Sequence, residues 1–348
     1  MTTDFSSVSL IASRLIVSTL IFLTVVIAAA ACSTNKNKPT DPIKPFELTH
    51  KDHPLVGKIW DVNQEQYTTK EQLLEKVLSS DYIMLGETHD NIKHHEDHGW
   101  IIRELSMKKP NTAVAFEMVN EEQANNINSA ENLSTEKALD ILEEAKTGWE
   151  YKKYYGPVFE SVVQAKLKIY PADLDRPTMM KVVREGEENA PDELQALLEK
   201  KQLSDEEREA LRKEIEATHC GMINEDMTKA MMLGQRTRDA AIGNNLYRAR
   251  TSDTQAVVLV SGSGHVRKDR GAPMYLSAQD NNASILTIAW LEVAEEATDP
   301  KDYAKPWGKE TMPFDYVVFT PAADRPDPCE EMKKFMQHKK NHGKKSDE

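Results

Sequence analysis

Short runs of mostly apolar residues, each followed by polar or glycine-rich sequence, constrain the fold of this chain most strongly. Strands that are buried on both faces read as continuous apolar runs, whereas half-exposed strands alternate apolar and polar residues. Helical patterns separate these runs, and alternating strands and helices are typical of α/β proteins. The sequence therefore predicts an α/β fold whose mainly parallel sheet is flanked by helices. The predicted strands are Tyr82–Leu85, Ala113–Phe116, Leu167–Tyr170, Ala256–Val260, Ile285–Trp290 and Tyr316–Phe319.

One long segment, from about residue 177 to 250, contains no such strand. Acidic residues outnumber basic ones between 184 and 216, and leucines such as Leu194, Leu198 and Leu211 supply the apolar positions. This pattern predicts solvated helices with one apolar face. We expect an all-helical insertion or lid subdomain within an α/β domain that covers residues 50–332.

The N-terminus carries the pattern of an export signal. Residues 15–31 are uncharged and end in Ala28–Ala31, directly before Cys32. This sequence resembles the lipobox of a bacterial lipoprotein, so we expect residues 1–31 to be removed and Cys32 to be lipidated. A plain cleaved signal and an uncleaved anchor are the alternatives. Residues 32–49 are then a lipid-anchored linker.

The residue after Cys32 bears on where the protein resides. By resemblance to lipoprotein sorting rules, Ser33 favours an outer-membrane lipid anchor, on the periplasmic or cell-surface side. At the other end, residues 333–348 are rich in lysine and are expected to form a mobile basic tail.

Charge and cysteine content narrow the partners. The formal net charge of −13 argues against nucleic-acid binding, because attraction to phosphates needs an excess of clustered basic residues. An exported chain meets oxidising conditions, and Cys220 and Cys329 are the thiols left after Cys32. A disulfide between them and two free thiols are both compatible with the sequence.

Polar residues stand where three predicted strands end. Glu87 and His89 follow the first strand, Glu117 follows the second, and His265 follows the fourth. The carboxyl ends of parallel strands line one edge of a sheet, so these four side chains can converge in a crevice there. They could act as general base and acid, or His89, His265 and Glu117 could bind a divalent metal. A structural histidine is the alternative for each ring alone.

The same residues carry a family resemblance. The chain resembles the ChaN family of haem-binding lipoproteins, within a superfamily that includes Tiki, TraB and erythromycin-esterase-like proteins, over about residues 50–332. The matching motifs are Gly86-Glu87-Thr88-His89-Asp90-Asn91 with His94-His95; Phe116-Glu117-Met118 with Gln123; Trp149 with Tyr155 and Pro157; Gln235 with Arg238-Asp239; Gly262-Ser263-Gly264-His265-Val266 with Gly271 and Pro273; and Phe314-Asp315-Tyr316, ending near Asp327-Pro328-Cys329.

This resemblance implies a role in haem and iron uptake. It implies haem as ligand, a homodimer, a membrane tether through Cys32 and an outer-membrane haem receptor as partner. ChaN-like haem binding is associated with tyrosine ligation, and a phenolate suits ferric iron. The candidate haem contacts are Tyr151, Tyr154, Tyr155, His95 and Arg176. Packing of a helix onto the sheet is the alternative role for the tyrosines.

Two principal functions therefore compete. The first is a lipid-anchored periplasmic protein that binds haem, and the second is a metal-dependent hydrolase that uses Glu87, His89, Glu117 and His265. The sequence lacks a G-x-S-x-G elbow, which disfavours a serine hydrolase of the α/β type. A scaffold for another protein, with a purely structural polar cluster, is the third option.

Overall fold

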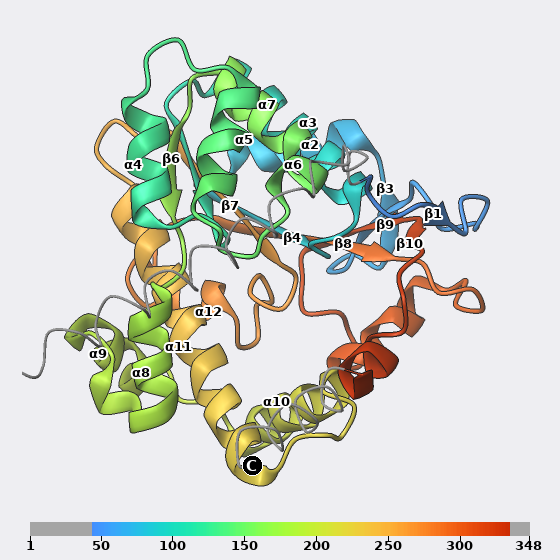
Figure 1. The fold of residues 1–348 in the computed structure, drawn as a ribbon. Helices are drawn as coiled ribbons and strands as arrows, with labels where there is room; N and C mark the ends of the chain where they lie inside the picture. The colour runs from blue at the N-terminus through green and yellow to red at the C-terminus, as the bar shows by residue number, and fades with distance from the viewer. Residues whose placement is uncertain (1–43, 335–348) are drawn as a thin grey trace, which may run out of the picture. The chain divides into compact units, whose positions relative to one another are not determined.

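The computed structural model describes residues 44–334, and its centre is a mostly parallel sheet (Figure 1). Within these residues eight strands lie in the order β3-β2-β9-β8-β4-β7-β5-β6. Strands β4 to β9 pair in parallel, whereas β2 and β3 run antiparallel at one side. The strands are β2 (Ile59–Asp61), β3 (Gln66–Thr68), β4 (Tyr82–Glu87), β5 (Thr112–Phe116), β6 (Lys168–Pro171), β7 (Ala256–Gly262), β8 (Ile285–Glu292) and β9 (Tyr316–Thr320). All six predicted strands are confirmed.

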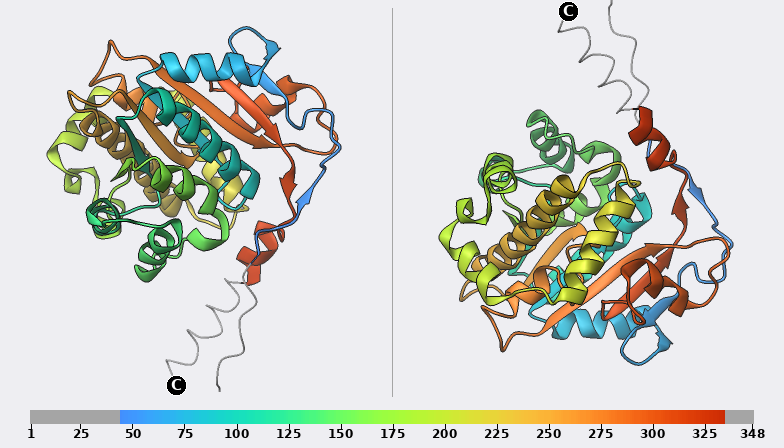
Figure 2. Two further views of the ribbon diagram at one scale, coloured as in Figure 1. Left: turned by 90° about the horizontal axis from the view of Figure 1, so that it is seen from above. Right: turned by 90° about the horizontal axis from the view of Figure 1, so that it is seen from below.

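Helices cover both faces of this sheet, as Figure 2 shows from opposite sides. One face packs against α2 (Lys70–Ser79), α3 (Ile92–Lys108), α4 (Glu121–Ser129), α5 (Thr135–Glu144), α6 (Tyr151–Tyr154) and α7 (Gly156–Gln164). The other face packs against the C-terminal half of α11 (Glu225–Ala249), α12 (Ala272–Leu276) and the 3-10 helix η2 (Pro300–Trp307).

The apolar runs of the sequence follow from this double cover. In β4, Ile83 and Leu85 enter the core on the α3 and α7 side, whereas Tyr82 and Met84 enter the core on the α11 and α12 side. Successive side chains of a strand point to opposite faces, so a strand between two helical layers needs apolar residues at every position.

Helices α3 and α7 approach each other closely beneath the end of β4. A Cβ atom on Gly99 of α3 would lie only 2.5 Å from the carbonyl oxygen of Pro157 in α7, so a side chain cannot be accommodated there. The same approach brings the ring of His95 in α3 beside Tyr154 of α6 and Tyr155 at the start of α7.

The predicted all-helical insertion is present. It comprises α8 (Arg176–Glu185), the 3-10 helix η1 (Glu187–Asn189), α9 (Asp192–Lys200), α10 (Asp205–Thr218) and the N-terminal part of α11. Its leucines form small apolar cores of their own, one with Leu194 and Leu198 and another with Leu203 and Leu211. The sequence did not predict the antiparallel strands β2 and β3, nor the short pair β1 (Leu48–Thr49) and β10 (Ala322–Ala323).

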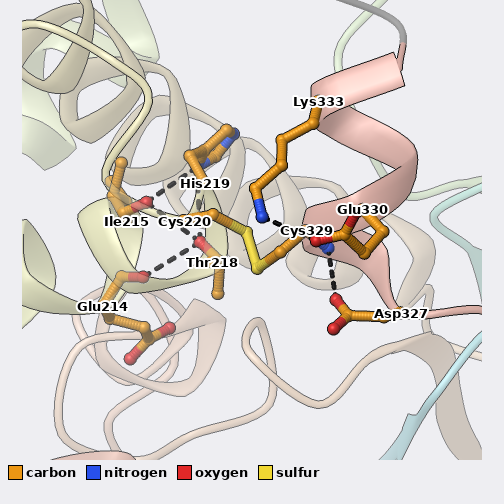
Figure 3. Close-up of a disulfide and its surroundings, with 9 residues drawn as sticks. All are labelled: Glu214, Ile215, Thr218, His219, Cys220, Asp327, Cys329, Glu330 and Lys333. Carbon is orange, nitrogen blue, oxygen red and sulfur yellow. Dashed lines mark hydrogen bonds and ion pairs between the residues drawn. A yellow bond between two sulfur atoms is a disulfide. The ribbon is translucent and has the colours of Figure 1, made fainter.

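A disulfide ties the insertion to the C-terminal part of the described chain. Cys220, in the turn between α10 and α11, is bonded to Cys329, in helical residues 328–334 (Figure 3). Helix α10 is also held by Glu214, whose carboxylate pairs with Arg267, at 2.8 Å, and with Arg270 in the loop after β7. Both contacts fix the insertion beside the loop that carries His265.

Some predicted features lie outside the described residues. These are the leader 1–31, the lipidated Cys32, most of the linker 32–49 and most of the tail 333–348. Among residues 44–334, no helix has the length and apolar character needed to span a membrane.

Removing the disulfide should destabilise the protein. The Cys220→Ser/Cys329→Ser double variant should lose about 2–5 kcal/mol of unfolding free energy, because the bond closes a loop between residues 109 apart. Urea unfolding of the variant and of the oxidised wild type measures this loss. Reduced wild type should match the variant, and equal stability of all three forms would contradict the prediction.

Candidate functional site

The polar residues at three strand ends do converge. Glu87 ends β4 directly beside Gly262 of β7, and Glu117 follows Phe116, the last residue of β5. The Nε2 atom of His89 lies 3.8 Å from one oxygen of Glu117, and the Nε2 atom of His265 lies 3.7 Å from the other. The Glu117 carboxylate therefore stands between the two imidazole rings.

Glu117 is buried and strongly bound. Its Oε2 atom accepts a hydrogen bond from the backbone N–H of Gly262 at 2.7 Å, and its Oε1 atom accepts one from Arg238 at 2.6 Å. Burial alone would raise the pKa of Glu117, but the charges of His265, His89 and Arg238 and the Gly262 hydrogen bond lower it to about 2. Glu117 is a carboxylate at neutral pH.

Helix α11 contributes residues that the sequence analysis did not assign to the site. Arg238 bridges Glu117 and Asp173, whose Oδ2 atom accepts from its Nε–H at 2.6 Å. Asp239 lies 2.6 Å from Nδ1 of His265, and Gln235 reaches the same nitrogen at 3.2 Å. The spacing of Gln235, Arg238 and Asp239 places them on one face of a helix, which was the available signal.

Each ring nitrogen of His265 lies close to a carboxylate. Burial alone would lower its pKa, but the negative charges of Glu117 and Asp239 raise it above the ordinary value. Asp239 contacts Nδ1, so Nε2 is the nitrogen that faces Glu117. A carboxylate behind one ring nitrogen fixes the ring orientation and leaves the other nitrogen for chemistry.

Of the two histidines beside Glu117, His89 is the more accessible. Its side chain is 35% exposed, its Nδ1 lies 2.9 Å from Glu87, and Trp149 packs edge-on against its ring at 4.8 Å. A Cβ atom at Gly262 would lie 3.0 Å from His89 Nε2, so glycine gives the ring its room. Burial lowers the pKa of His89, but Glu117 and Glu87 outweigh this effect and raise it to about 9.

Glu87 lies beneath His89 and is fully buried. Tyr155 donates to its Oε1 atom at 2.7 Å, His95 Nε2 lies 3.1 Å from the same oxygen, and His98 Nδ1 lies 3.2 Å from Oε2. Burial would raise the pKa of Glu87, but the charge of His95 and the close ring nitrogens of His89, His95 and His98 lower it well below the ordinary value. His95, which the sequence analysis named as a candidate haem contact, therefore contacts Glu87 in this structure.

The predicted haem contacts do not form an open platform. Tyr151, Tyr154 and Tyr155 are at most 2% exposed, and His95 is fully buried. Their rings pack among α3, α6 and α7, which matches the alternative role given to them from the sequence. Arg176 is exposed at the start of α8, in the insertion. Haem ligation by any of these residues stays a prediction, and it requires the packing around the tyrosines to open.

The predicted metal ligands His89, Glu117 and His265 are brought together, as described. Across residues 44–334, however, no group of three or more His, Cys, Asp or Glu side chains has an arrangement that could hold a metal ion. Acid–base chemistry is what the observed contacts support, because each histidine has one nitrogen bound to a carboxylate and the other close to Glu117.

Comparison with known proteins places this site in a family. The family described as haem-binding uptake, Tiki superfamily, ChaN matches residues 73–276, which is more than half of the chain and includes all the site residues above. The chain belongs to this family. A comparison with curated proteins found no match.

Two solved structures resemble this chain, and the first of them supports the fold. ChaN of Campylobacter jejuni, from a study of its cofacial haem binding, is 19% identical, with a TM-score of 0.57 over 75% of this chain and 95% of that protein. A mutant of the erythromycin esterase EreC in its open conformation is 12% identical, with a TM-score of 0.44 over 79% of this chain and 99% of that protein. The second likeness is too distant to support any inference.

Replacing Arg238 tests whether its charge is needed to hold the carboxylates of Glu117 and Asp173 in the site. Arg238→Met should lower the unfolding free energy by about 3–5 kcal/mol, because it leaves two carboxylates, 3% and 14% exposed, without their cation. Urea unfolding measures the loss.

A matched control exists elsewhere in the chain. Arg250 also bridges two carboxylates, those of Asp81 and Asp280, but these are 32% and 23% exposed. Arg250→Met should therefore cost only about 1 kcal/mol. Equal losses in the two variants would contradict the account of a buried charge network.

Proposed function

We propose that this protein is a lipid-anchored haem-binding protein of haem and iron uptake, acting as a homodimer at the periplasmic or cell-surface face of the outer membrane. Its membership in the haem-binding ChaN family carries this proposal. The fold shared with the Campylobacter jejuni protein supports it, since that protein binds haem cofacially. The tether through Cys32 and an outer-membrane haem receptor as partner belong to the same proposal.

Among the three candidate tyrosines, Tyr154 is best suited to ligate haem iron. The hydroxyl groups of Tyr151 and Tyr155 donate to Met118 and Glu87, whereas that of Tyr154 has no hydrogen-bond partner in the described part of the chain. A phenol without such a bond can become an iron ligand without the loss of a hydrogen bond within the fold.

The surroundings of Tyr154 suggest how haem would reach it. The half-buried ring of Phe46 packs 6.4 Å from the Tyr154 ring, and the ammonium of Lys153 lies 4.9 Å from both rings. Displacement of Phe46 would open this position to a porphyrin, and Lys153 could then pair with a propionate.

Titration of ferric haem into the full chain in detergent tests this function. Wild type should show saturable Soret changes and a tyrosinate charge-transfer band, and Tyr154→Phe should lose that band. Tyr151→Phe is the matched control and should retain it, because its hydroxyl is already bound to Met118. Absence of saturable binding in the wild type would contradict the haem function.

Hydrolysis is a second candidate function, and the arrangement of the two histidines around Glu117 favours it. His89 is accessible, its Nε2 atom faces Glu117, and His265 faces the same carboxylate from the other side. In this proposal neutral His89 removes a proton from water, while protonated His265 donates one to the leaving group. Glu87 and Asp239 hold the two rings from behind.

This second function predicts a pH profile. The pKa of His89 is raised to about 9, so a general base at this position becomes active as pH rises toward 9. In a screen of carboxylic esters, kcat/KM should rise with pH as His89 loses its proton and fall again once His265, the general acid, loses its own. His89→Gln should lower the rate by about 10²–10⁴-fold. A rate that His89→Gln leaves unchanged would rule His89 out as the base.

A further inference from the structure

The side chains around Glu87 serve a purpose that packing alone does not explain. A carboxylate removed from water is costly unless donors replace the lost hydration. Four polar groups surround Glu87: the Tyr155 hydroxyl and His89 Nδ1 hydrogen-bond to it, and one nitrogen each of His95 and His98 lies within 3.2 Å. Of these four groups, only His89 is accessible to solvent.

His95 and His98 are directed at this one carboxylate. Both are fully buried and lie about one turn apart on α3. Across residues 44–334, no aligned hydrogen bond satisfies either ring, but one nitrogen of each lies close to the Glu87 carboxylate, at 3.1 and 3.2 Å. Burial lowers the pKa of His98, so its ring is neutral and has a single proton to offer.

Aromatic packing prevents these two rings from turning away. The ring of Tyr155 lies 4.2 Å from that of His95, and Trp290 packs edge-on against His98 at 4.5 Å. Trp290 is itself fixed, because its indole N–H donates to Asp97 at 3.1 Å. The position of the Glu87 carboxylate is therefore determined from its buried side.

We propose that His95 and His98 are positioning residues that act on His89 through Glu87. They hold the carboxylate so that its Oε1 atom accepts the Nδ1–H of His89, and in the neutral ring the bare Nε2 then faces Glu117. Tyr155, which contacts both Glu87 and His89 Nδ1, completes the arrangement. The inference deepens the hydrolytic function and rests on it, because only there does His89 need a bare Nε2.

Nitrogen NMR of histidine-labelled full chain in detergent tests the proposal without a substrate. Above the His89 pKa of about 9, the wild-type spectrum should show a protonated Nδ1 and a bare Nε2. Loss of the signal in His89→Gln assigns the ring. A wild-type His89 that carries its proton on Nε2 overturns the proposal, whatever the variants do.

The variants separate positioning from general stability. His95→Leu and His98→Leu should turn the His89 signals into an average of two tautomers, whereas His98→Gln, which keeps an N–H donor toward Glu87, should restore the wild-type pattern. His94→Gln is the control, because buried His94 on the same helix contacts Thr88 and Thr320 rather than Glu87. It should leave His89 unchanged.

The test does not depend on whether the leucine variants fold. If they do not, the His89 signals of the wild type are compared with those of His98→Gln, and an averaged His89 signal in the wild type overturns the proposal. Wild-type signals retained in both leucine variants overturn it as well. An unsuccessful search for a hydrolysed ester would count against the hydrolytic function but would not alter these spectra, so the two failures can be distinguished.

Discussion

The buried carboxylate of Glu87 is the interaction on which the site depends. It stands at the end of the central strand β4 with its side chain buried, so polar groups of the chain must replace its hydration. Those groups come from α3, from the start of α7 and from the loop after β4. A single strand end thereby links the helical layer on one face to the polar cluster at the sheet edge.

Glu117 is a second buried carboxylate that is held by groups from several elements. Its carboxylate is shared by Arg238 from α11, by the backbone of β7 and by the two imidazole rings. Because α11 begins in the helical insertion and ends on the sheet, the insertion determines where Arg238 and Asp239 lie. The disulfide Cys220–Cys329 and the contacts of Glu214 anchor the neighbouring helix α10. The insertion is therefore a structural part of the site.

Much of this arrangement could be predicted from the sequence, for a physical reason. Strands covered on both faces must be apolar throughout, so β4, β5 and β7 are visible as runs, and the first polar residue after each run marks the crevice. The short antiparallel strands β2 and β3 lack such runs and were not predicted. Arg238 and Asp239 lie in a long helix whose register against the sheet the sequence does not state. The same limit applies to Tyr151, Tyr154 and Tyr155, since an aromatic cluster can be a ligand platform or a packed core, and burial alone separates the two.

The charge state of Glu87 is the most direct test of this account. Infrared difference spectra between wild type and Glu87→Gln, recorded at neutral pH, isolate the vibrations of this one carboxyl group. The wild type should show a carboxylate stretch, because the charge of His95 and the close ring nitrogens of His89, His95 and His98 hold the pKa of Glu87 well below its ordinary value. A protonated C=O stretch that disappears in the variant would contradict it, because a neutral carboxylic acid could not position His89 as described.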